Sequence, residues 1–335
     1  MDRDLIQLAA CLAALMYFSD RWFIVGAAQL ANRLKMSTVV VGVLIVGFGT
    51  SAPELVVSIL AILEEGPAGT ELAMGNVVGS NVANLTLVLA IPALVYRGGV
   101  EFPEGTPREA YFSTIAVAAL ATVLLLIDYG HIEAWHGSST MTGVGLLLAL
   151  VILLLLVQTK GSKWGGQEPP EERSGLNPWI RTLVGLVGTV LAAHFLVDSA
   201  TSIAEELGWT TGFVGFTLVA LGTSLPELVT VLAAARQRQS GLIIGNLLGS
   251  NLFNSVGVGG VIFFTHGVKS FDPPQNLDRI SIIGMVGVSV LILVFLKKKN
   301  FLKRPSKDRI DSREAVVLLV AYGLLISRMV VTATG

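Results

Sequence analysis

The chain has 335 residues, of which 53% are hydrophobic and only 14% are charged, and its net charge is -1. Soluble globular proteins carry about 25% charged residues, so this composition excludes an ordinary soluble fold, and the near-neutral charge gives no basic surface for nucleic acid. The single cysteine excludes an intramolecular disulfide framework and a cysteine-based metal cluster.

Ten apolar stretches follow one another along the chain. A helix needs about 20 mostly apolar residues to cross a bilayer, and each stretch is close to that length or longer. We therefore predict an all-α integral membrane protein with ten transmembrane helices, at 5–32, 37–63, 72–96, 110–128, 140–158, 178–207, 211–235, 240–265, 279–297 and 314–333.

The basic residues are divided unequally between the two sides of these spans, and the side that carries the excess is cytoplasmic. With both termini placed outside, eighteen of the 23 basic residues fall inside: Arg33, Lys35, Arg97, Arg108, Lys160, Lys163, Arg173, Arg181, Arg236, Arg238, Lys297, Lys298, Lys299, Lys303, Arg304, Lys307, Arg309 and Arg313. The asymmetry predicts a multi-pass protein of the cell membrane with extracellular N- and C-termini.

The two halves of the chain repeat each other. VGVLIVGFGTSAPELV at 41–56 matches VGFTLVALGTSLPELV at 214–229, and GNVVGSNVAN at 75–84 matches GNLLGSNLFN at 245–254. We divide the chain into a first five-helix repeat at 1–158, a cytoplasmic linker at 159–177 and a second five-helix repeat at 178–335. Because five is odd, the second repeat enters the membrane from the opposite side. Such inverted repeats are typical of secondary transporters, which bind their substrate at the repeat interface near the membrane midplane.

Glu54 and Glu227 occupy equivalent positions well inside the second and seventh spans, each directly after a proline. A carboxylate at that depth costs about 2.5–3.5 kcal/mol on insertion scales, so it indicates a function by default. We expect the preceding Gly-Thr-Ser turns, at 49–51 and 222–224, to unwind, which a membrane tolerates only around a polar site. Two carboxylates, four hydroxyls and freed carbonyls then predict a doubly anionic site made entirely of oxygen.

The second motif of each repeat adds neutral oxygen atoms. Its serine and its last asparagine are four residues apart and share a helix face, so Ser80 with Asn84, and Ser250 with Asn254, can face the glutamates. We expect the other asparagines to bond to backbone or to neighbouring helices and to support the ligands from behind: Asn76, Asn81, Asn246 and Asn251. The glycines of the motif permit close helix packing: Gly75, Gly79, Gly245 and Gly249.

An oxygen-only site selects among ions. Ca²⁺ accepts six to eight oxygen ligands in flexible geometry, whereas Mg²⁺ demands a tight octahedron. His194 lies outside the motifs, so a soft transition-metal site is not supported. Two carboxylates balance one Ca²⁺ or two Na⁺, and when emptied of metal they repel and tend to share a proton, so protons should compete with the cations.

The same charges predict how transport is coupled. An empty carrier would have to move two unpaired carboxylates through an occluded state with little water, at a large energetic cost. A loaded carrier avoids that cost. We therefore expect the protein to change sides only with ions bound, which makes it an exchanger rather than a uniporter.

The doubled GTS-x-PELV and GN-xx-GSN motifs resemble the paired alpha-repeat signature of the sodium/calcium exchanger family, over nearly the whole chain. The resemblance implies Na⁺-driven Ca²⁺ export, with the first and sixth helices sliding past a rigid core, in a compact prokaryotic-type member. By position, the implied ligands are Thr50, Ser51, Glu54, Ser80, Asn84, Thr223, Ser224, Glu227, Ser250 and Asn254, together with carbonyls at Gly47 and Ala220.

One position divides the family that the chain resembles. Some members, notably K⁺-dependent exchangers, carry Asp where this chain has Asn254. Asparagine favours K⁺-independent exchange and leaves two rather than three acids for Na⁺. The expected partners are Ca²⁺, Na⁺ and competing protons in a lipid bilayer, without nucleic acid, and a monomer can carry out this function. No catalytic residue and no cofactor is expected, since Ca²⁺ and Na⁺ are transported substrates.

Other interpretations remain open. A Ca²⁺/H⁺ antiporter on the same scaffold is the nearest alternative. A glutamate after proline can also be structural and cap a broken helix. An intramembrane hydrolase needs a nucleophile with a base or a pair of aspartates, and no His or Lys lies near the motif serines. A channel fits inverted, broken helices less well than alternating access does.

Overall fold

A computed structural model of the chain describes residues 2–65, 67–96, 99–101, 106–128, 135–160, 176–206, 223–269, 279–302 and 309–334. Predictions on other residues, including most of the linker and the start of the seventh span, lie outside the described residues. Nearly all of the described residues are helical, which is how a chain in lipid satisfies its own backbone hydrogen bonds.

The helices of the first repeat follow the predicted spans, several of which contain a π-helical segment. The first span is α1 (Asp2–Tyr17), η1 (Phe18–Phe23) and α2 (Ile24–Leu34), and the second is α3 (Thr38–Val41), η2 (Gly42–Gly47), α4 (Phe48–Thr50) and α5 (Ala52–Glu65). The third span is α6 (Pro67–Ala83), η3 (Asn84–Val88) and α7 (Leu89–Val95), followed by α8 (Thr106–Asp128) and α9 (Trp135–Lys160).

The second repeat has corresponding helices: α10 (Pro178–Glu206), α13 (Leu225–Arg236), α14 (Ser240–Leu252) continued by η5 (Phe253–Val258) and α15 (Gly259–Lys269), α16 (Arg279–Leu302) and α17 (Ser312–Thr334). Among the described residues, eight helical stretches are long and apolar enough to cross a membrane. The other two predicted spans are the seventh, described only from Thr223 onward, and the tenth, which is the 23-residue helix α17.

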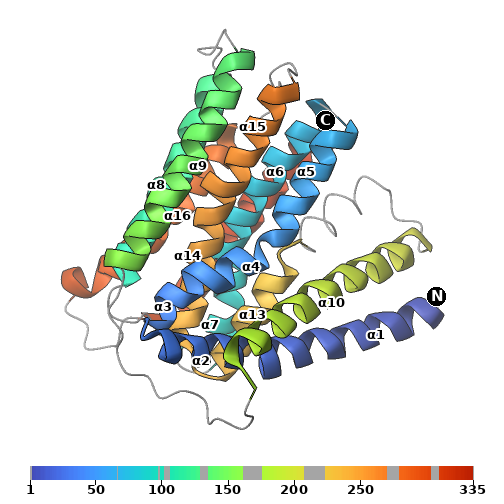
Figure 1. Ribbon diagram of the computed structural model, residues 1–335, viewed down its shortest axis with the longest axis vertical. Helices are drawn as coiled ribbons and strands as arrows, with labels where there is room; N and C mark the ends of the chain where they lie inside the picture. The colour runs from blue at the N-terminus through green and yellow to red at the C-terminus, as the bar shows by residue number, and fades with distance from the viewer. Residues whose placement is uncertain are drawn as a thin grey trace.

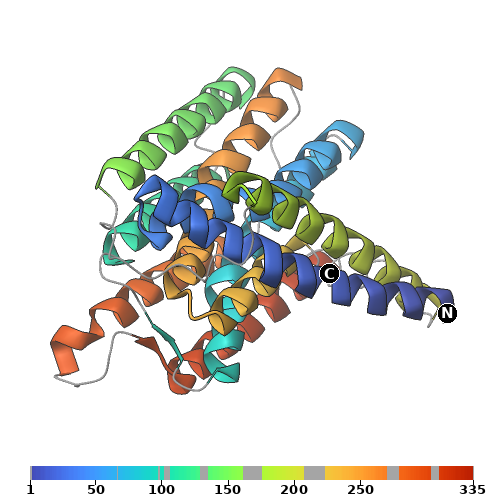
Figure 2. The same cartoon turned by 60° about the horizontal axis from the view of Figure 1, so that its bottom comes forward.

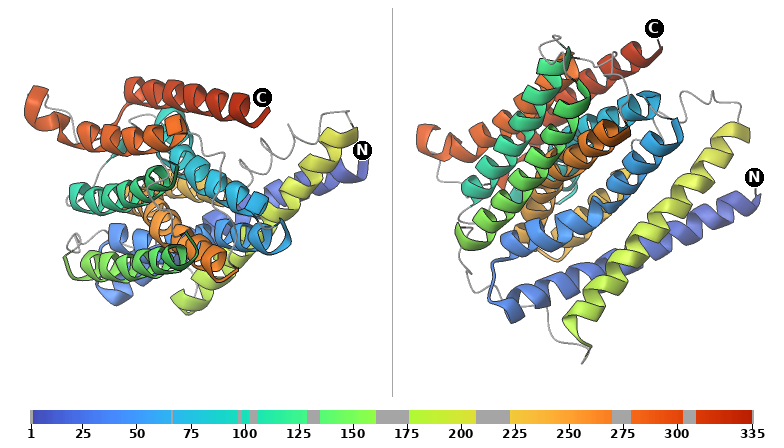
Figure 3. Two further views of the ribbon diagram at one scale, coloured as in Figure 1. Left: turned by 90° about the horizontal axis from the view of Figure 1, so that it is seen from above. Right: turned by 45° about the horizontal axis from the view of Figure 1, so that its top comes forward.

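The helices form a bundle with one separate pair. Helices α1 and α10 pack against each other along one side of the bundle and extend together beyond it, as Figures 1, 2 and 3 show. In the rest of the bundle α9 packs on α15, α16 on α8 and α5 on α6, while α14 contacts η2, α3 and α8. The separate pair consists of the first and sixth spans, the two helices that the family resemblance predicts to slide.

Two clusters of buried hydrophobic side chains fill the bundle, and the boundary between them falls at the polar motifs. Along the third span the change from one cluster to the other occurs between Val82 and Leu85, and along the eighth span between Leu248 and Leu252. The motif residues Asn84 and Ser250 lie at these boundaries. The packing therefore encloses a polar layer between two apolar ones.

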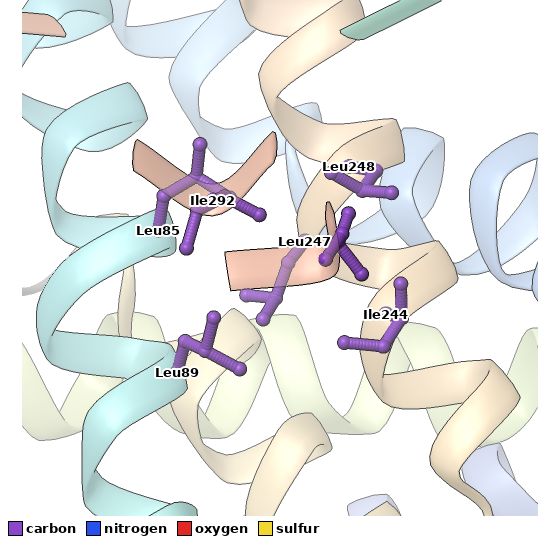
Figure 4. A pocket seen from close by; sticks show the side chains of 7 residues that line it. Leu85, Leu89, Ile244, Leu247, Leu248 and Ile292 are labelled. Carbon is purple, nitrogen blue, oxygen red and sulfur yellow. The ribbon is translucent and has the colours of Figure 1, made fainter. Parts of the chain in front are cut away.

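The apolar layers are closely packed. Where η3, α7, α14 and α16 meet, the space left between side chains is about 10 Å³, lined by Leu85, Leu89, Ile244, Leu247, Leu248, Ile292 and Leu296 (Figure 4). A void of this size with only apolar walls stays empty of water. This space therefore offers no site for an ion.

Glycine brings α14 against the second span, as the motif predicts. A Cβ added at Gly245 would lie 2.3 Å from the carbonyl oxygen of Val39, and one added at Gly249 would lie 2.6 Å from the Cα of Val43. Real Cβ atoms do not approach so closely, so the contact requires glycine. For Gly75 and Gly79, the corresponding start of the seventh span lies outside the described residues, and close packing there stays a prediction.

One feature outside the helices was not predicted. Strand β1 (Val100–Glu101) pairs antiparallel with β2 (Arg309–Ile310), with Val100 opposite Ile310. The side chains of Val100 and Ile310 are buried. The ladder joins the loop after the third span to the loop before the tenth, so it ties the two repeats together.

Candidate cation-binding site

A single residue interrupts each motif helix, so the predicted unwinding of the first Gly-Thr-Ser turn is wrong. Helix α4 ends at Thr50, and only Ser51 (φ -85°, ψ 5°) separates it from α5. The Ser51 N–H still donates to the Gly47 carbonyl at 3.2 Å. The reason is that Pro53 is the second residue of α5, where a backbone N–H has no partner within the helix anyway.

The second copy has the same geometry where it is described. Ser224 (φ -89°, ψ 2°) precedes α13, whose second residue is Pro226. Gly222, the start of this turn, lies outside the described residues. The two serines therefore mark equivalent kinks, one in each repeat.

Each kink places a glutamate in the first turn of the helix that follows. Glu54 is the third residue of α5 and Glu227 the third residue of α13, and both side chains have 0% exposure. The N-terminal turn of a helix favours negative charge by about 0.3–1 kcal/mol. That is much less than the cost of burying a carboxylate, so the helix alone does not stabilise these charges.

The interpretation of these glutamates as helix caps is not supported. A capping glutamate would bond to backbone N–H groups at its own helix start. Instead, among the described residues neither carboxylate oxygen of Glu54 has a hydrogen-bond partner, and Oε2 of Glu227 has none either.

Hydroxyl groups from both repeats gather around Glu227. Ser51 Oγ donates to Glu227 Oε1 at 3.3 Å, and Ser250 Oγ lies 3.5 Å from the same oxygen. Ser250 Oγ is also 3.2 Å from the Gly47 carbonyl and 3.3 Å from Thr50 Oγ1. The second, seventh and eighth spans thus meet through five of the sequence-predicted site residues.

The two predicted asparagine ligands lie on segments that contact the opposite repeat. Segment η3, which begins with Asn84, packs against α13, and η5, which contains Asn254, packs against α5. Asn84 and Asn254 are buried, and neither amide has a hydrogen-bond partner among the described residues. Each asparagine is therefore carried on a segment that packs against the glutamate helix of the opposite repeat.

Unpartnered polar atoms are concentrated among these motif residues. Besides the carboxylates and the two amides, the hydroxyls of Ser80 and Ser224 are buried without a partner in the described part of the chain. Each such atom costs about 1–3 kcal/mol when left unsatisfied. A cation would bind these oxygens and offset that cost. Of the predicted ligands, only Ala220 lies outside the described residues.

The four other motif asparagines divide into two pairs. Asn81 donates to Ser255 Oγ at 2.9 Å and Asn251 donates to the Asn81 carbonyl at 2.9 Å, in agreement with their predicted bonds to neighbouring helices. Asn76 and Asn246 instead accept hydrogen bonds from Thr223 at 3.3 Å and Thr50 at 2.9 Å. These two asparagines therefore lie directly behind predicted ligands, in the supporting position expected for them, and all four positions belong to the repeated motif.

Comparisons with known proteins agree with this geometry. The family model described as sodium/calcium exchanger protein matches residues 5–159 and 177–331. The sodium/calcium exchanger MaX1 of Methanosarcina acetivorans is 27% identical over 341 residues, covering 90% of this chain and 91% of that protein. The Ca²⁺/H⁺ antiporter ChaA of Bacillus subtilis is 25% identical over 301 residues, covering 85% and 81%.

A solved structure of the sodium-calcium exchanger NCX_Mj superposes with a TM-score of 0.79 at 27% identity, covering 97% of this chain and 98% of that chain. The family model matches each half separately, which confirms the predicted architecture of two inverted repeats of membrane-spanning helices. The members of this family are transporters rather than enzymes, and the chain belongs to the sodium/calcium exchanger protein family.

Proposed function

We propose that this protein is a secondary antiporter that exchanges Ca²⁺ for Na⁺ by alternating access, independently of K⁺. The observation that carries the proposal is the pair of buried carboxylates, Glu54 and Glu227, at matched positions of the two repeats, since three of their four oxygens have no hydrogen-bond partner among the described residues. The neutral oxygens of Thr50, Ser51 and Ser250 lie beside them. Carboxylates supplemented by neutral oxygens are the ligands that Ca²⁺ prefers.

Charge balance supports exchange of these two ions. Two carboxylates neutralise one Ca²⁺ or two Na⁺. With either set of ions bound, the site is therefore nearly neutral when the protein changes sides. No group of three or more acidic, His or Cys side chains occurs among the described residues, in keeping with Asn254 rather than an acid at the position that divides the family. The amide of Asn254, in place of an acid at this position, supports K⁺ independence.

Protons are the competing candidate for the counter-ion. The similarity to ChaA, a Ca²⁺/H⁺ antiporter, favours this second function. Two carboxylates close to each other share a proton readily when no metal is bound. We favour Na⁺ because the similarity to the sodium/calcium exchangers MaX1 and NCX_Mj covers 90% and 97% of this chain, against 85% for ChaA.

The protein is proposed to reside in the plasma membrane with both termini outside, and to work as a monomer built of repeats 1–158 and 178–335 joined by the linker 159–177. With both termini outside, eighteen of the 23 basic residues lie on the cytoplasmic side, and this asymmetry supports the proposed topology. Ca²⁺ and Na⁺ are its substrates, and it needs no further cofactor.

Uptake of ⁴⁵Ca by proteoliposomes tests the choice of counter-ion. Vesicles loaded with Na⁺ and diluted into Na⁺-free medium are expected to accumulate ⁴⁵Ca at the same rate with and without K⁺. Vesicles with only a pH gradient are expected to accumulate much less. Accumulation driven by the pH gradient and insensitive to Na⁺ would favour the Ca²⁺/H⁺ function instead, and a requirement for K⁺ would contradict K⁺ independence.

A further inference from the structure

Asn76 and Asn246 make the same contact in the two repeats. Thr50 Oγ1 donates to Asn246 Oδ1 at 2.9 Å, and Thr223 Oγ1 donates to Asn76 Oδ1 at 3.3 Å. Asn76 lies on α6 of the first repeat and Asn246 on α14 of the second, so each asparagine reaches a threonine of the opposite repeat. The contact therefore occurs twice, with the roles of the repeats exchanged.

The direction of these hydrogen bonds matters for a cation ligand. A threonine hydroxyl has one proton and two lone pairs. When the proton is donated to an asparagine oxygen, the hydroxyl can offer only lone pairs to its other neighbours. A metal ion needs such lone pairs and would be repelled by the proton.

Without the asparagine, the proton of Thr50 would have other acceptors. The Gly47 carbonyl lies 3.4 Å from Thr50 Oγ1 and Ser250 Oγ lies 3.3 Å from it, both farther than Asn246 Oδ1. Helical hydroxyls commonly bond back to a carbonyl of the preceding turn, as Thr182 and Thr189 do here. Asn246 is thus the nearest of the three acceptors and competes for the proton of Thr50 with the Gly47 carbonyl, which is itself an expected ligand.

The surroundings of Asn246 leave it little freedom to turn. Its side chain has 0% exposure, and its Oδ1 also lies 3.4 Å from Ser250 Oγ, a second expected ligand. Its Nδ2 has no partner among the described residues, and the same holds for Nδ2 of Asn76. In both repeats, therefore, the hydrogen bonds to the amide are those donated by hydroxyls of the site.

We propose that Asn76 and Asn246 are positioning residues that accept the hydroxyl protons of Thr223 and Thr50 and thereby direct the lone pairs of these threonines toward the transported cation. This inference rests on the proposed function, since it requires that the two threonines bind the ion. Removing a partner that orients a metal ligand typically weakens metal affinity about 10-fold to 100-fold.

A double-mutant cycle on purified, full-length protein tests the inference. Asn246→Leu removes the acceptor at similar size, Thr50→Val removes the hydroxyl, and the double variant removes both. Two quantities are measured: the Ca²⁺ concentration for half-maximal ⁴⁵Ca uptake in Na⁺-loaded proteoliposomes, and the Ca²⁺ concentration that half-maximally raises the unfolding temperature. We expect Asn246→Leu to raise both half-maximal Ca²⁺ concentrations about tenfold and to leave the maximal uptake rate within about twofold of wild type. The double variant should bind Ca²⁺ no more weakly than Thr50→Val alone.

Asn251→Leu is the matched control. Asn251 lies on the same helix and donates to the Asn81 carbonyl rather than accepting from a threonine. Its loss should lower thermal stability, and its effect on Ca²⁺ affinity should combine with that of Thr50→Val as two independent changes. Because Asn76 is less buried than Asn246, the cycle of Asn76→Leu with Thr223→Val gives the same test if Asn246→Leu does not fold.

The outcomes separate this inference from the proposed function. The positioning role would be overturned, while the wild type still exchanges, by either of two results. One is unchanged Ca²⁺ affinity in Asn246→Leu and Asn76→Leu. The other is a double variant in each cycle whose fold-loss of Ca²⁺ affinity equals the product of the two single losses. A wild type that neither takes up ⁴⁵Ca in response to Na⁺ nor is stabilised by Ca²⁺ would overturn the proposed function itself.

Discussion

Glu54 and Glu227 are both buried, and three of their four carboxylate oxygens have no hydrogen-bond partner among the described residues. A buried carboxylate without a partner destabilises the fold, and two that repel each other do so more. The protein tolerates this cost because the same oxygens are available to a cation. Stability and ion binding should therefore respond in opposite directions when either charge is removed.

Neutralising one glutamate should stabilise the empty protein. In alkaline buffer without Ca²⁺ or Na⁺, Glu54→Gln is expected to raise the free energy of unfolding by about 1–3 kcal/mol, the cost of an unsatisfied buried polar group, and to abolish the additional stabilisation by Ca²⁺. Thermal unfolding with and without Ca²⁺ measures both. Glu314→Gln is the control, because Glu314 accepts a hydrogen bond from Asp311 N–H at the start of α17. An empty Glu54→Gln protein that is less stable than wild type would mean that the carboxylate is satisfied within the fold.

Asn254 sets the number of acids at the site. Asn254→Asp is expected to add a third carboxylate to the site and to strengthen competition by protons, because neighbouring carboxylates raise one another's affinity for protons. The pH at which Na⁺-driven ⁴⁵Ca uptake is half-maximal should rise by about one unit or more.

Two further substitutions calibrate this shift in the pH profile. Asn84→Asp, at the equivalent position of the first repeat, should act in the same direction. Asn177→Asp, on an exposed residue, should leave the profile unchanged. A profile that does not move in Asn254→Asp would remove Asn254 from the site.

At the scale of elements, the polar layer depends on how closely α14 approaches the second span. Gly245 and Gly249 bring α14 into backbone contact with α3 and η2, and this contact places Ser250 beside Thr50 and the Gly47 carbonyl. A larger residue at the contact would separate these oxygens.

Gly245→Ala should consequently destabilise the protein. The added Cβ would lie 2.3 Å from the Val39 carbonyl oxygen, and overpacking of this kind costs about 1–3 kcal/mol. Chemical unfolding in detergent measures the loss. At Gly287 an added Cβ would meet nothing within 4 Å, so Gly287→Ala should be neutral or up to about 1 kcal/mol more stable, as alanine favours the helix. Equal stabilities of the two variants would contradict the close approach.

Hydropathy and the repeat are enough to predict the spans and the motif positions, since both are properties of local sequence. The Gly-Thr-Ser-x-Pro motif indicates where the two helices are interrupted, but not that the interruption is limited to Ser51 and Ser224. The π-helical segments η3 and η5 are not predictable in this way, because no local pattern marks them. The same is true of Asp20 in η1, which pairs with Arg236 at 3.3 Å and accepts a hydrogen bond from Gln237 at 2.9 Å. These contacts join residues far apart in the sequence, and no local pattern indicates them.

For the site, the doubled motif predicts the identity of the buried oxygens but not their hydrogen bonds. Glu54, Glu227, Ser80 and Asn84 are buried as expected. The role of Asn246 as acceptor for Thr50 depends on the distance between α14 and α4, which the sequence does not reveal.

At the scale of the whole molecule, the distribution of basic residues places the loop after the fourth span outside the cell and the linker between the repeats inside it. The single cysteine, Cys11, makes this testable by labelling intact cells with a membrane-impermeant maleimide. In a Cys11→Ala background, Gly130→Cys should be labelled and Ser174→Cys should be protected until the cells are permeabilised. The reverse pattern would contradict extracellular termini.

The paired carboxylates should make transport obligatorily coupled, because an empty site carries two charges that cannot cross an occluded state. The most direct test compares ⁴⁵Ca entry into wild-type, Glu54→Gln and Glu227→Gln proteoliposomes, with and without internal Na⁺. Wild type should take up ⁴⁵Ca only with internal Na⁺, and each variant should lose at least about 99% of that rate, since the glutamates are the only charged ligands proposed. Rapid ⁴⁵Ca entry into wild-type vesicles without any counter-cation, or wild-type exchange in both variants, would contradict a coupled site built on Glu54 and Glu227.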